Sequence, residues 1–204
     1  EQDKFVLNIL KGKHNGFFLE IGSNHPINTN NTYILETVFN WKGIMIEYDD
    51  TWLNDYKNLR KNSKHLIIDC TYIDYKELLK DLPKNIDYLQ IDVEVNNGST
   101  IKILEKLDTE IMHSHKFATV TFKHNYYNSG EYKYTREKSR NIFEKRGYVN
   151  VFYDINDNDP NKVYEDWWVH PDLVDMEYIK ELKQCNVINY KKNHLVNETI
   201  NWKD

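Results

Sequence analysis

Short apolar runs recur along the chain, and most of them end on polar or acidic residues. Segments with apolar residues at helical spacing lie between these runs. Because such alternation is typical of a parallel sheet covered on both faces, it predicts an α/β fold. The predicted strands are Phe17–Ile21, Gly43–Tyr48, Leu66–Asp69, Ile86–Asp92, Phe117–Lys123, Tyr148–Tyr153 and Tyr164–Val169. The predicted helices are Lys4–Leu10, Asn31–Asn40, Trp52–Arg60, Tyr75–Leu82, Thr100–Leu107, Thr135–Arg146 and Asp172–Gln184.

The last two predicted strands are joined by a short connection near 156–162. A parallel pair needs a long crossover, so these two strands are expected to form an antiparallel hairpin at the sheet edge. A chain of 204 residues is the size of one domain with a core of its own. We therefore predict a single domain over 1–204, with a core over about 2–175 and a helix and tail over 176–204.

The stretch 16–50 contains a strand, a tight turn, a helix and a second strand that ends on an acid. Gly22 in the turn lets the backbone approach a ligand, because glycine has no Cβ. Glu47 follows Gly22 by 25 residues, which is close to the spacing of about 20 at which an acid meets ribose hydroxyls. A carboxylate suits a vicinal diol, since it offers only acceptors. This unit predicts a site for the adenosine part of a cofactor.

The same turn does not resemble a phosphate-binding loop. A dinucleotide loop has three glycines, whereas this turn has one glycine followed by Asn24, His25 and Pro26. An adenosyl ligand without phosphates, such as S-adenosylmethionine, therefore fits better. The alternative is a plain βαβ unit in which Glu47 is a solvated strand end.

Net charge, apolar runs and cysteine usage indicate which partners and which compartment to expect. The net charge is −5 without a basic cluster, which argues against a nucleic-acid partner. Apolar runs are all too short to span a membrane. Cys70 and Cys185 are too few and too far apart for a disulfide framework, so we expect the cytoplasm or another reducing compartment.

Acidic residues stand at the ends of four of the five central predicted strands. Because the carboxyl ends of parallel strands meet at one edge, these residues predict a ligand site there. The alternative is that strand ends simply reach water. The five strand ends are Glu20–Asn24, Glu47–Asp49, Asp69–Thr71, Asp92–Asn96 and Lys123–Tyr127.

An ordered set of motifs over about 2–175 resembles FkbM-like S-adenosylmethionine-dependent methyltransferases. The motifs are FLEIGSN, the helix start NTYILE, GIMIEY, IDYLQIDVE, SRNIFEKRGYVNVF and YEDWWVHPDLVD. The resemblance implies a Rossmann-like class I methyltransferase fold, with a seven-stranded mostly parallel sheet, helices on both faces and an antiparallel edge hairpin. It also implies O-methylation of a hydroxyl, often on a sugar or glycan. The cofactor contacts that it implies are Glu20, Gly22, Ser23, Asn24, Asn31, Thr32, Glu47, Tyr48, Asp69, Cys70 and Asp92.

The chain departs from this family at the end of the fifth predicted strand. Where relatives tend to have Thr-Phe-Glu-His-Asp, it has Lys123 and Asn125 on either side of His124. The departure leaves a catalytically silent cofactor-binding module as an alternative. A methyltransferase for a small metabolite or a protein also remains open, and the sequence does not predict an oligomeric state.

Methyl transfer to a hydroxyl needs a base, or a metal that lowers the hydroxyl pKa. His124 is the first candidate because imidazole titrates near neutral pH, although a structural histidine is the alternative. Asp92 is the second candidate, unless it only positions the cofactor. A divalent metal on Asp92, Glu94 and His124 is not favoured, since Lys123 would repel it.

A group near the C-terminal end of the predicted core is expected to bind the acceptor. Aromatic faces stack on sugar rings, so Trp167 and Trp168 are candidates together with His170. Because neighbouring strand residues point to opposite faces, we expect one tryptophan inside and one at the site. Arg140 is expected to hold an anionic group of the acceptor, and the alternative is that it pairs with surface acids.

Overall fold

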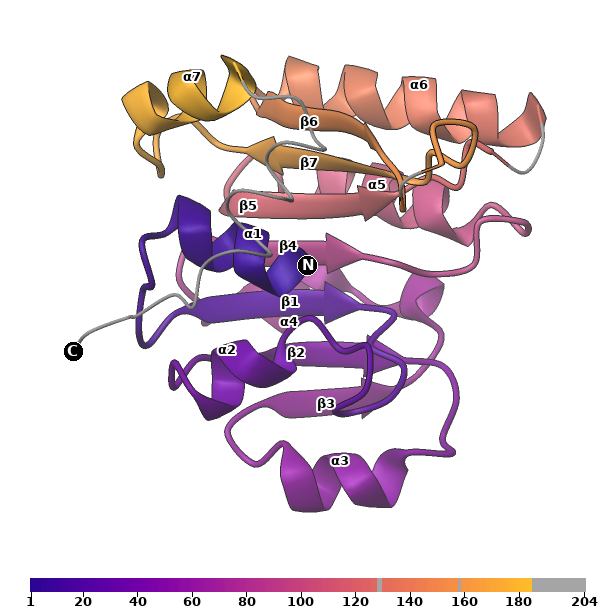
Figure 1. Ribbon diagram of the computed structural model, residues 1–204. Helices are drawn as coiled ribbons and strands as arrows, with labels where there is room; N and C mark the ends of the chain where they lie inside the picture. The colour runs from indigo at the N-terminus through magenta and orange to yellow at the C-terminus, as the bar shows by residue number, and fades with distance from the viewer. Residues whose placement is uncertain (128–129, 158, 185–204) are drawn as a thin grey trace.

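The computed structural model describes residues 1–127, 130–157 and 159–184, and its seven strands form one sheet in the order β3-β2-β1-β4-β5-β7-β6 (Figure 1). The first five strands are parallel to one another, whereas β7 is antiparallel to both β5 and β6. The predicted edge hairpin is therefore confirmed. The strands are β1 (Phe17–Ile21), β2 (Lys42–Glu47), β3 (Lys64–Ile67), β4 (Asn85–Ile91), β5 (Lys116–Lys123), β6 (Val149–Ile155) and β7 (Glu165–Val169).

Each predicted helix overlaps an observed helix. The helix α2 is shorter than predicted, and the chain turns into β2 through Asn40, whose φ is 56°. The α-helices are α1 (Gln2–Ile9), α2 (Tyr33–Thr37), α3 (Leu53–Leu59), α4 (Tyr75–Leu79), α5 (Ser99–Glu110), α6 (Gly130–Lys145) and α7 (Met176–Gln184), and a short 3₁₀ helix, η1, covers Cys70–Tyr72.

The two faces of the sheet carry separate apolar cores, because successive strand residues point to opposite sides. Leu19 belongs to the core on one face, together with side chains of α4, α5 and α6. Its neighbour Phe18 packs with side chains of α1, α2 and α7, such as Phe5, on the other face. Full burial of each such side chain contributes about 2 kcal/mol, so both layers stabilise the sheet.

The strand order reverses between β1 and β4. The chain moves outward from β1 to β2 and β3, and it returns to place β4 on the other side of β1. In open α/β sheets, ligands bind beyond the carboxyl ends of the strands at such a switch point. The helices of the described ranges all lack the length and apolarity needed to cross a bilayer. The predicted tail lies largely outside the described residues, from 185 to 204.

Candidate functional site

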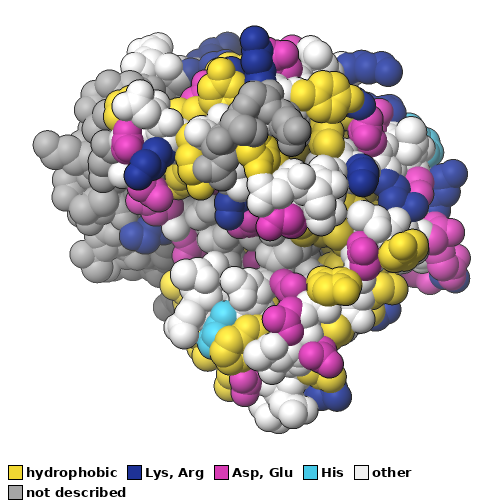
Figure 2. All heavy atoms as spheres, turned by 90° about the vertical axis from the view of Figure 1, so that its right-hand side faces the viewer, with side chains coloured by type: hydrophobic (Ala, Val, Ile, Leu, Met, Phe, Trp, Pro, Cys, Tyr) yellow, Lys and Arg dark blue, Asp and Glu magenta, His cyan; other side chains and the backbone are white. Residues whose placement is uncertain are grey.

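A cavity of about 860 Å³ lies over the carboxyl ends of β1 to β5, at the switch point of the sheet. Figure 2 views the molecule from this edge, where acidic side chains surround a hollow. The cavity is lined by residues of all five of the strand ends that the sequence singled out, from Gly22 after β1 to Lys123 at the end of β5. A cavity thus lies at the edge where the sequence predicted a ligand site.

Gly22 occupies a position that no other residue fits. Its φ is 87°, and a Cβ at this position would lie 1.9 Å from the carbonyl oxygen of Asp92. The Gly22 N–H donates to the carbonyl of Ile46 at 2.9 Å, which fixes the turn against β2. Because Gly22 has no side chain, the ends of β1 and β4 lie close together in the cavity wall.

Glu47 is held in one orientation at the end of β2. Its Oε2 accepts the N–H of Asn24 at 2.7 Å, and its Oε1 accepts the N–H of Tyr48 at 2.7 Å and of Asp49 at 3.1 Å. The side chain is half-buried and lines the cavity. It thus presents a fixed carboxylate where the sequence predicted one.

The cavity wall is strongly acidic. Lys123 is the one basic side chain among the described lining residues. A polyphosphate would be repelled by this wall, whereas a cationic ligand with hydroxyl groups would be attracted. The acidic lining residues are Glu47, Asp49, Asp69, Asp92 and Glu94.

Eight of the eleven predicted cofactor residues line the cavity. Among them, Cys70 is buried, and burial raises the pKa of its thiol to about 11, so it is not a reactive thiolate. The eight are Gly22, Ser23, Asn24, Glu47, Tyr48, Asp69, Cys70 and Asp92. The other three, Glu20, Asn31 and Thr32, do not line it.

Glu20 and Thr32 lie behind the wall in a buried network. Glu20 Oε2 accepts the hydroxyl of Thr32 at 2.7 Å and the amide of Asn30 at 3.2 Å, and Arg60 donates to the same Thr32 hydroxyl at 2.8 Å. Burial raises the pKa of Glu20 to about 7 despite the opposing charge of Arg60. These residues fix the turn after β1.

Asn31 also lies behind the cavity wall. Its side-chain amide donates to Gln90, a lining residue that the sequence did not single out.

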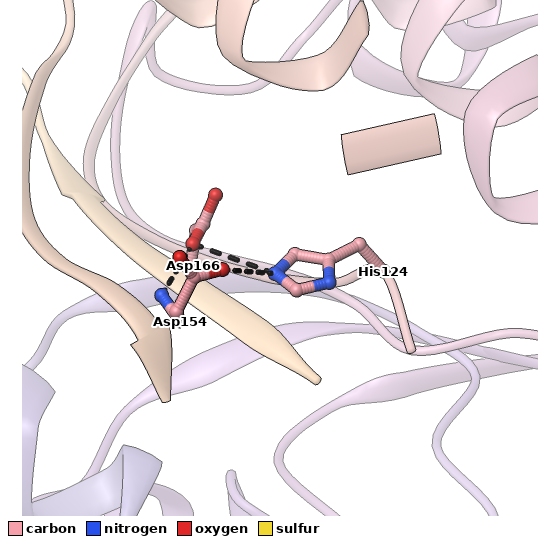
Figure 3. Close-up of side chains that lie close together, drawn as sticks. All are labelled: His124, Asp154 and Asp166. Atoms are coloured by element: carbon pink, nitrogen blue, oxygen red, sulfur yellow. Dashed lines mark hydrogen bonds and ion pairs between the residues drawn. The ribbon is translucent and has the colours of Figure 1, made fainter. Parts of the chain in front are cut away.

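His124 is fully buried and does not line the cavity. Its Nδ1 accepts the N–H of Tyr126 at 3.2 Å, and its Nε2 lies 3.4 Å from Asp166 Oδ1 and 3.8 Å from Asp154 Oδ1 (Figure 3). The imidazole is therefore not part of the cavity lining. The prediction that His124 faces the mouth of the site as a base is therefore wrong, and its structural alternative holds.

Within the described ranges, the group with metal-ligand geometry is His124, Asp154 and Asp166, and the predicted set of Asp92, Glu94 and His124 does not come together. Asp154 and Asp166 are already paired with arginine. Arg140 donates to Asp166 Oδ2 at 2.7 Å and to Asp154 Oδ1 at 2.8 Å, and Arg136 also donates to Asp154. Burial alone would raise the pKa of Asp166, but His124 and Arg140 outweigh it and lower this pKa. The guanidinium groups thus supply the positive charge that a metal would bring.

The four predicted acceptor residues lie elsewhere. Trp167 and Trp168 are both buried, one in each core, so the expectation that one of them would face the acceptor is wrong. His170 follows the far end of β7, since β7 runs antiparallel to β5, and it packs on Tyr148. Arg140 is engaged with the two acids described above. These side chains stabilise the hairpin instead of forming a binding surface.

Lys123 and Asn125, which belong to the fifth predicted strand end and depart from the family pattern, both line the cavity. Lys123 Nζ lies 2.8 Å from Asp92 Oδ1. Asn125 has a φ of 46°, and its Oδ1 is buried without a hydrogen-bond partner in the described structure. Their position at that strand end is the signal that placed them at this edge of the sheet.

No protein-family model matches the chain, and no curated protein matches its sequence. Solved structures do match its fold. A TehB-like SAM-dependent methyltransferase from Corynebacterium glutamicum is 7% identical with a TM-score of 0.53, over 82% of this chain and 86% of that one. An rRNA methylase from Streptococcus thermophilus is 11% identical with a TM-score of 0.53, over 83% of this chain and 93% of that one. The chain therefore has the Rossmann-like fold of class I methyltransferases.

Proposed function

We propose that this chain is an S-adenosylmethionine-dependent O-methyltransferase that acts on a hydroxyl of a sugar or glycan. The observation that carries the proposal is the cavity at the switch point, in which the Gly22 turn and the Glu47 carboxylate stand side by side. When bound, this cofactor supplies an electrophilic methyl group, and the protein aligns and activates the acceptor.

The lining residues fit this cofactor for three physical reasons. Glu47 offers acceptor oxygens to the ribose diol. The Gly22 turn, where a Cβ would collide with the Asp92 carbonyl, lets the backbone of both strand ends form the cavity wall. The acidic wall attracts a sulfonium and an ammonium group, and it disfavours nucleotides that carry several phosphates. We assign the adenosine to the side of Glu47, Tyr48, Asp69 and Cys70, and the reacting methyl group to the side of Asp92.

Asp92 becomes our candidate for the group that takes the acceptor proton, because His124 is buried away from the cavity. Lys123 occupies Asp92 Oδ1, whereas Oδ2 accepts no hydrogen bond from the described residues. Asp and Glu carboxylates act as general bases in enzymes, so this oxygen of Asp92 is suited to accept the proton. Glu94, Asn97 and Asn125 also line this end and offer hydrogen bonds to a polyhydroxyl acceptor.

The charge of the chain favours a glycan over a nucleic acid as acceptor. The net charge is −5, and acids dominate the mouth of the cavity, so a phosphate backbone would be repelled. The S. thermophilus structure described above is an rRNA methylase. RNA is therefore the alternative acceptor that the experiment compares with glycans. The free, buried thiol of Cys70 fits our proposal of a reducing intracellular compartment.

The test combines binding and transfer. Calorimetry with S-adenosylhomocysteine should give one site per chain, and incubation with methyl-labelled cofactor should transfer label to members of a glycan panel but not to RNA oligonucleotides. Absence of cofactor binding would overturn the proposal. Label on RNA, a small metabolite or a protein would keep the methyltransferase and replace the acceptor.

A catalytically silent binding module is the second candidate, and the Lys123–Asp92 pair favours it because it occupies one oxygen of the candidate base. Tight binding of S-adenosylhomocysteine, with no label on any acceptor in the presence or absence of divalent metal, would select this candidate.

A further inference from the structure

Lys123 stands out as a basic side chain in an acidic cavity. Its side chain is 34% exposed, and its ammonium contacts Asp92, whose side chain is 29% exposed. Both residues end neighbouring parallel strands, Asp92 directly after β4 and Lys123 on β5. The pair therefore lies on the cavity surface, where a ligand reaches it, and is not buried below it.

Glu165 supports Lys123 from the adjacent strand. The two residues are directly paired across β5 and β7, so their side chains share the face that α1 covers. Glu165 is buried, and it accepts Trp167 Nε1 at 2.6 Å and Gln2 Nε2 at 3.4 Å. Burial raises the pKa of Glu165 to about 7, and the negative charge of Asp92 adds to this effect. Lys123 is thus placed between one carboxylate at the surface and one beneath it.

The ammonium group has capacity left for a ligand. It carries three N–H donors, and Asp92 is its one hydrogen-bonding partner among the described residues. Burial would lower the pKa of Lys123, but the attraction of Asp92 outweighs it and raises this pKa. Lys123 is therefore a charged donor that is oriented toward the cavity with donors to spare.

We propose that Lys123 is a catalytic residue that donates a hydrogen bond to the acceptor oxygen, and that Asp92 and Glu165 position it. This inference rests on the proposed methyltransferase function. In the transfer, a bond forms between the acceptor oxygen and the methyl carbon while the bond between that carbon and sulfur breaks. The electron pair of the broken bond stays on sulfur, and the hydroxyl proton passes to Asp92.

The charge of Lys123 selects the kind of nucleophile. A hydroxyl becomes negative as it loses its proton, so a neighbouring ammonium stabilises it. An amine becomes positive as it accepts a methyl group, so the same ammonium opposes the reaction. The site therefore favours an oxygen acceptor over a nitrogen acceptor.

The placement of Lys123 is tested by calorimetry of the full chain with S-adenosylmethionine and S-adenosylhomocysteine. The two ligands differ by the positive charge on sulfur, so a lysine at the reacting centre opposes only the first. Lys123→Met should raise the ratio of the affinity for S-adenosylmethionine to that for S-adenosylhomocysteine by about fivefold. Lys123→Arg, which keeps the charge, should leave the ratio near that of the wild type.

Lys116→Met is the matched control, because Lys116 lies at the other end of β5 and pairs with Asp172 at the surface. Lys123→Gln replaces Lys123→Met if the latter does not fold. If the wild type binds both ligands and Lys123→Met changes the ratio no more than Lys116→Met, the inference is wrong while the proposed function stands. If the wild type binds neither ligand, both are overturned. Methylation of the amine of glucosamine would also overturn the inference.

Discussion

The backbone N–H of Asn24 donates a 2.7 Å hydrogen bond to Oε2 of Glu47, and this bond joins the turn after β1 to the end of β2. Asn24 has a φ of 50°, in the left-handed region where asparagine is tolerated. The carboxylate that we assign to the ribose therefore also fixes the turn that faces the rest of the ligand. One side chain controls both the contact and the shape of the site.

Replacing Glu47 with Ala should weaken binding of S-adenosylhomocysteine by at least about tenfold, because it removes acceptors for the ribose and releases the Asn24 turn. Calorimetry measures the loss. Asp55→Asn is the control, since Asp55 is exposed on α3 and away from the cavity, and it should bind like the wild type. Equal affinities for Glu47→Ala and the control would refute the ribose assignment.

Gly22→Ala and Gly147→Ala should differ in their effects on stability. Both glycines have positive φ, 87° and 81°, so alanine at either position costs about 1 kcal/mol of backbone strain. Only at Gly22 does the new Cβ collide with backbone, whereas nothing lies within 4 Å at Gly147. Urea unfolding should show a clearly larger loss for Gly22→Ala. Similar losses would mean that the turn relaxes and that close approach to Asp92 is not required.

The fold was predictable because its signals are local. Apolar runs of strand length, each ending in a polar turn, identify the central strands, and a short link identifies the hairpin. Gly22 and Glu47 were singled out for the same reason, since both belong to one βαβ unit and stand close in the sequence. This locality also placed the cavity, because the carboxyl ends of parallel strands meet at one edge whatever side chains they carry.

The acceptor residues were not predictable because their environment is set by distant partners. Arg140 is free to bind a ligand only if no acid reaches it, and Asp166 reaches it from 26 residues away. Strand alternation correctly separated Trp167 from Trp168, but it does not reveal that both faces of β7 are covered. His124 follows a strand end, yet its ring turns toward the hairpin. Which side chains are covered or neutralised depends on tertiary packing.

Arg140→Met should destabilise the protein by about 3 kcal/mol, because it leaves the buried Asp166 without its bidentate partner. Affinity for S-adenosylhomocysteine should not change, since Arg140 is outside the cavity lining. Lys133→Met is the control on the same helix, where Lys133 forms an exposed pair with Glu137. Urea unfolding and calorimetry measure the two effects. Weakened binding of S-adenosylhomocysteine in folded Arg140→Met would show that Arg140 contributes to the cofactor site, contrary to its position outside the cavity lining.

The buried acid Glu165 should make the protein less stable as the pH rises. In the folded protein its pKa is about 7, compared with an ordinary value of 4.5, because burial disfavours the charged form. Between these values the folded state keeps a proton that the unfolded state has released. The contribution of this proton is fully present below the ordinary pKa, and it is lost as the pH rises through about 7.

Glu165→Gln removes this proton while it keeps an acceptor for Trp167 Nε1. The variant should gain stability relative to the wild type between about pH 5 and about pH 8, by up to about 3 kcal/mol. Urea unfolding across this range measures the difference. Glu177→Gln on α7, where Glu177 is exposed, should follow the wild type at every pH. The buried Glu20 contributes in the same direction in all three proteins, so it cancels from the comparison. A constant difference between Glu165→Gln and the wild type would mean that Glu165 is ionised in the folded state, held by Lys123.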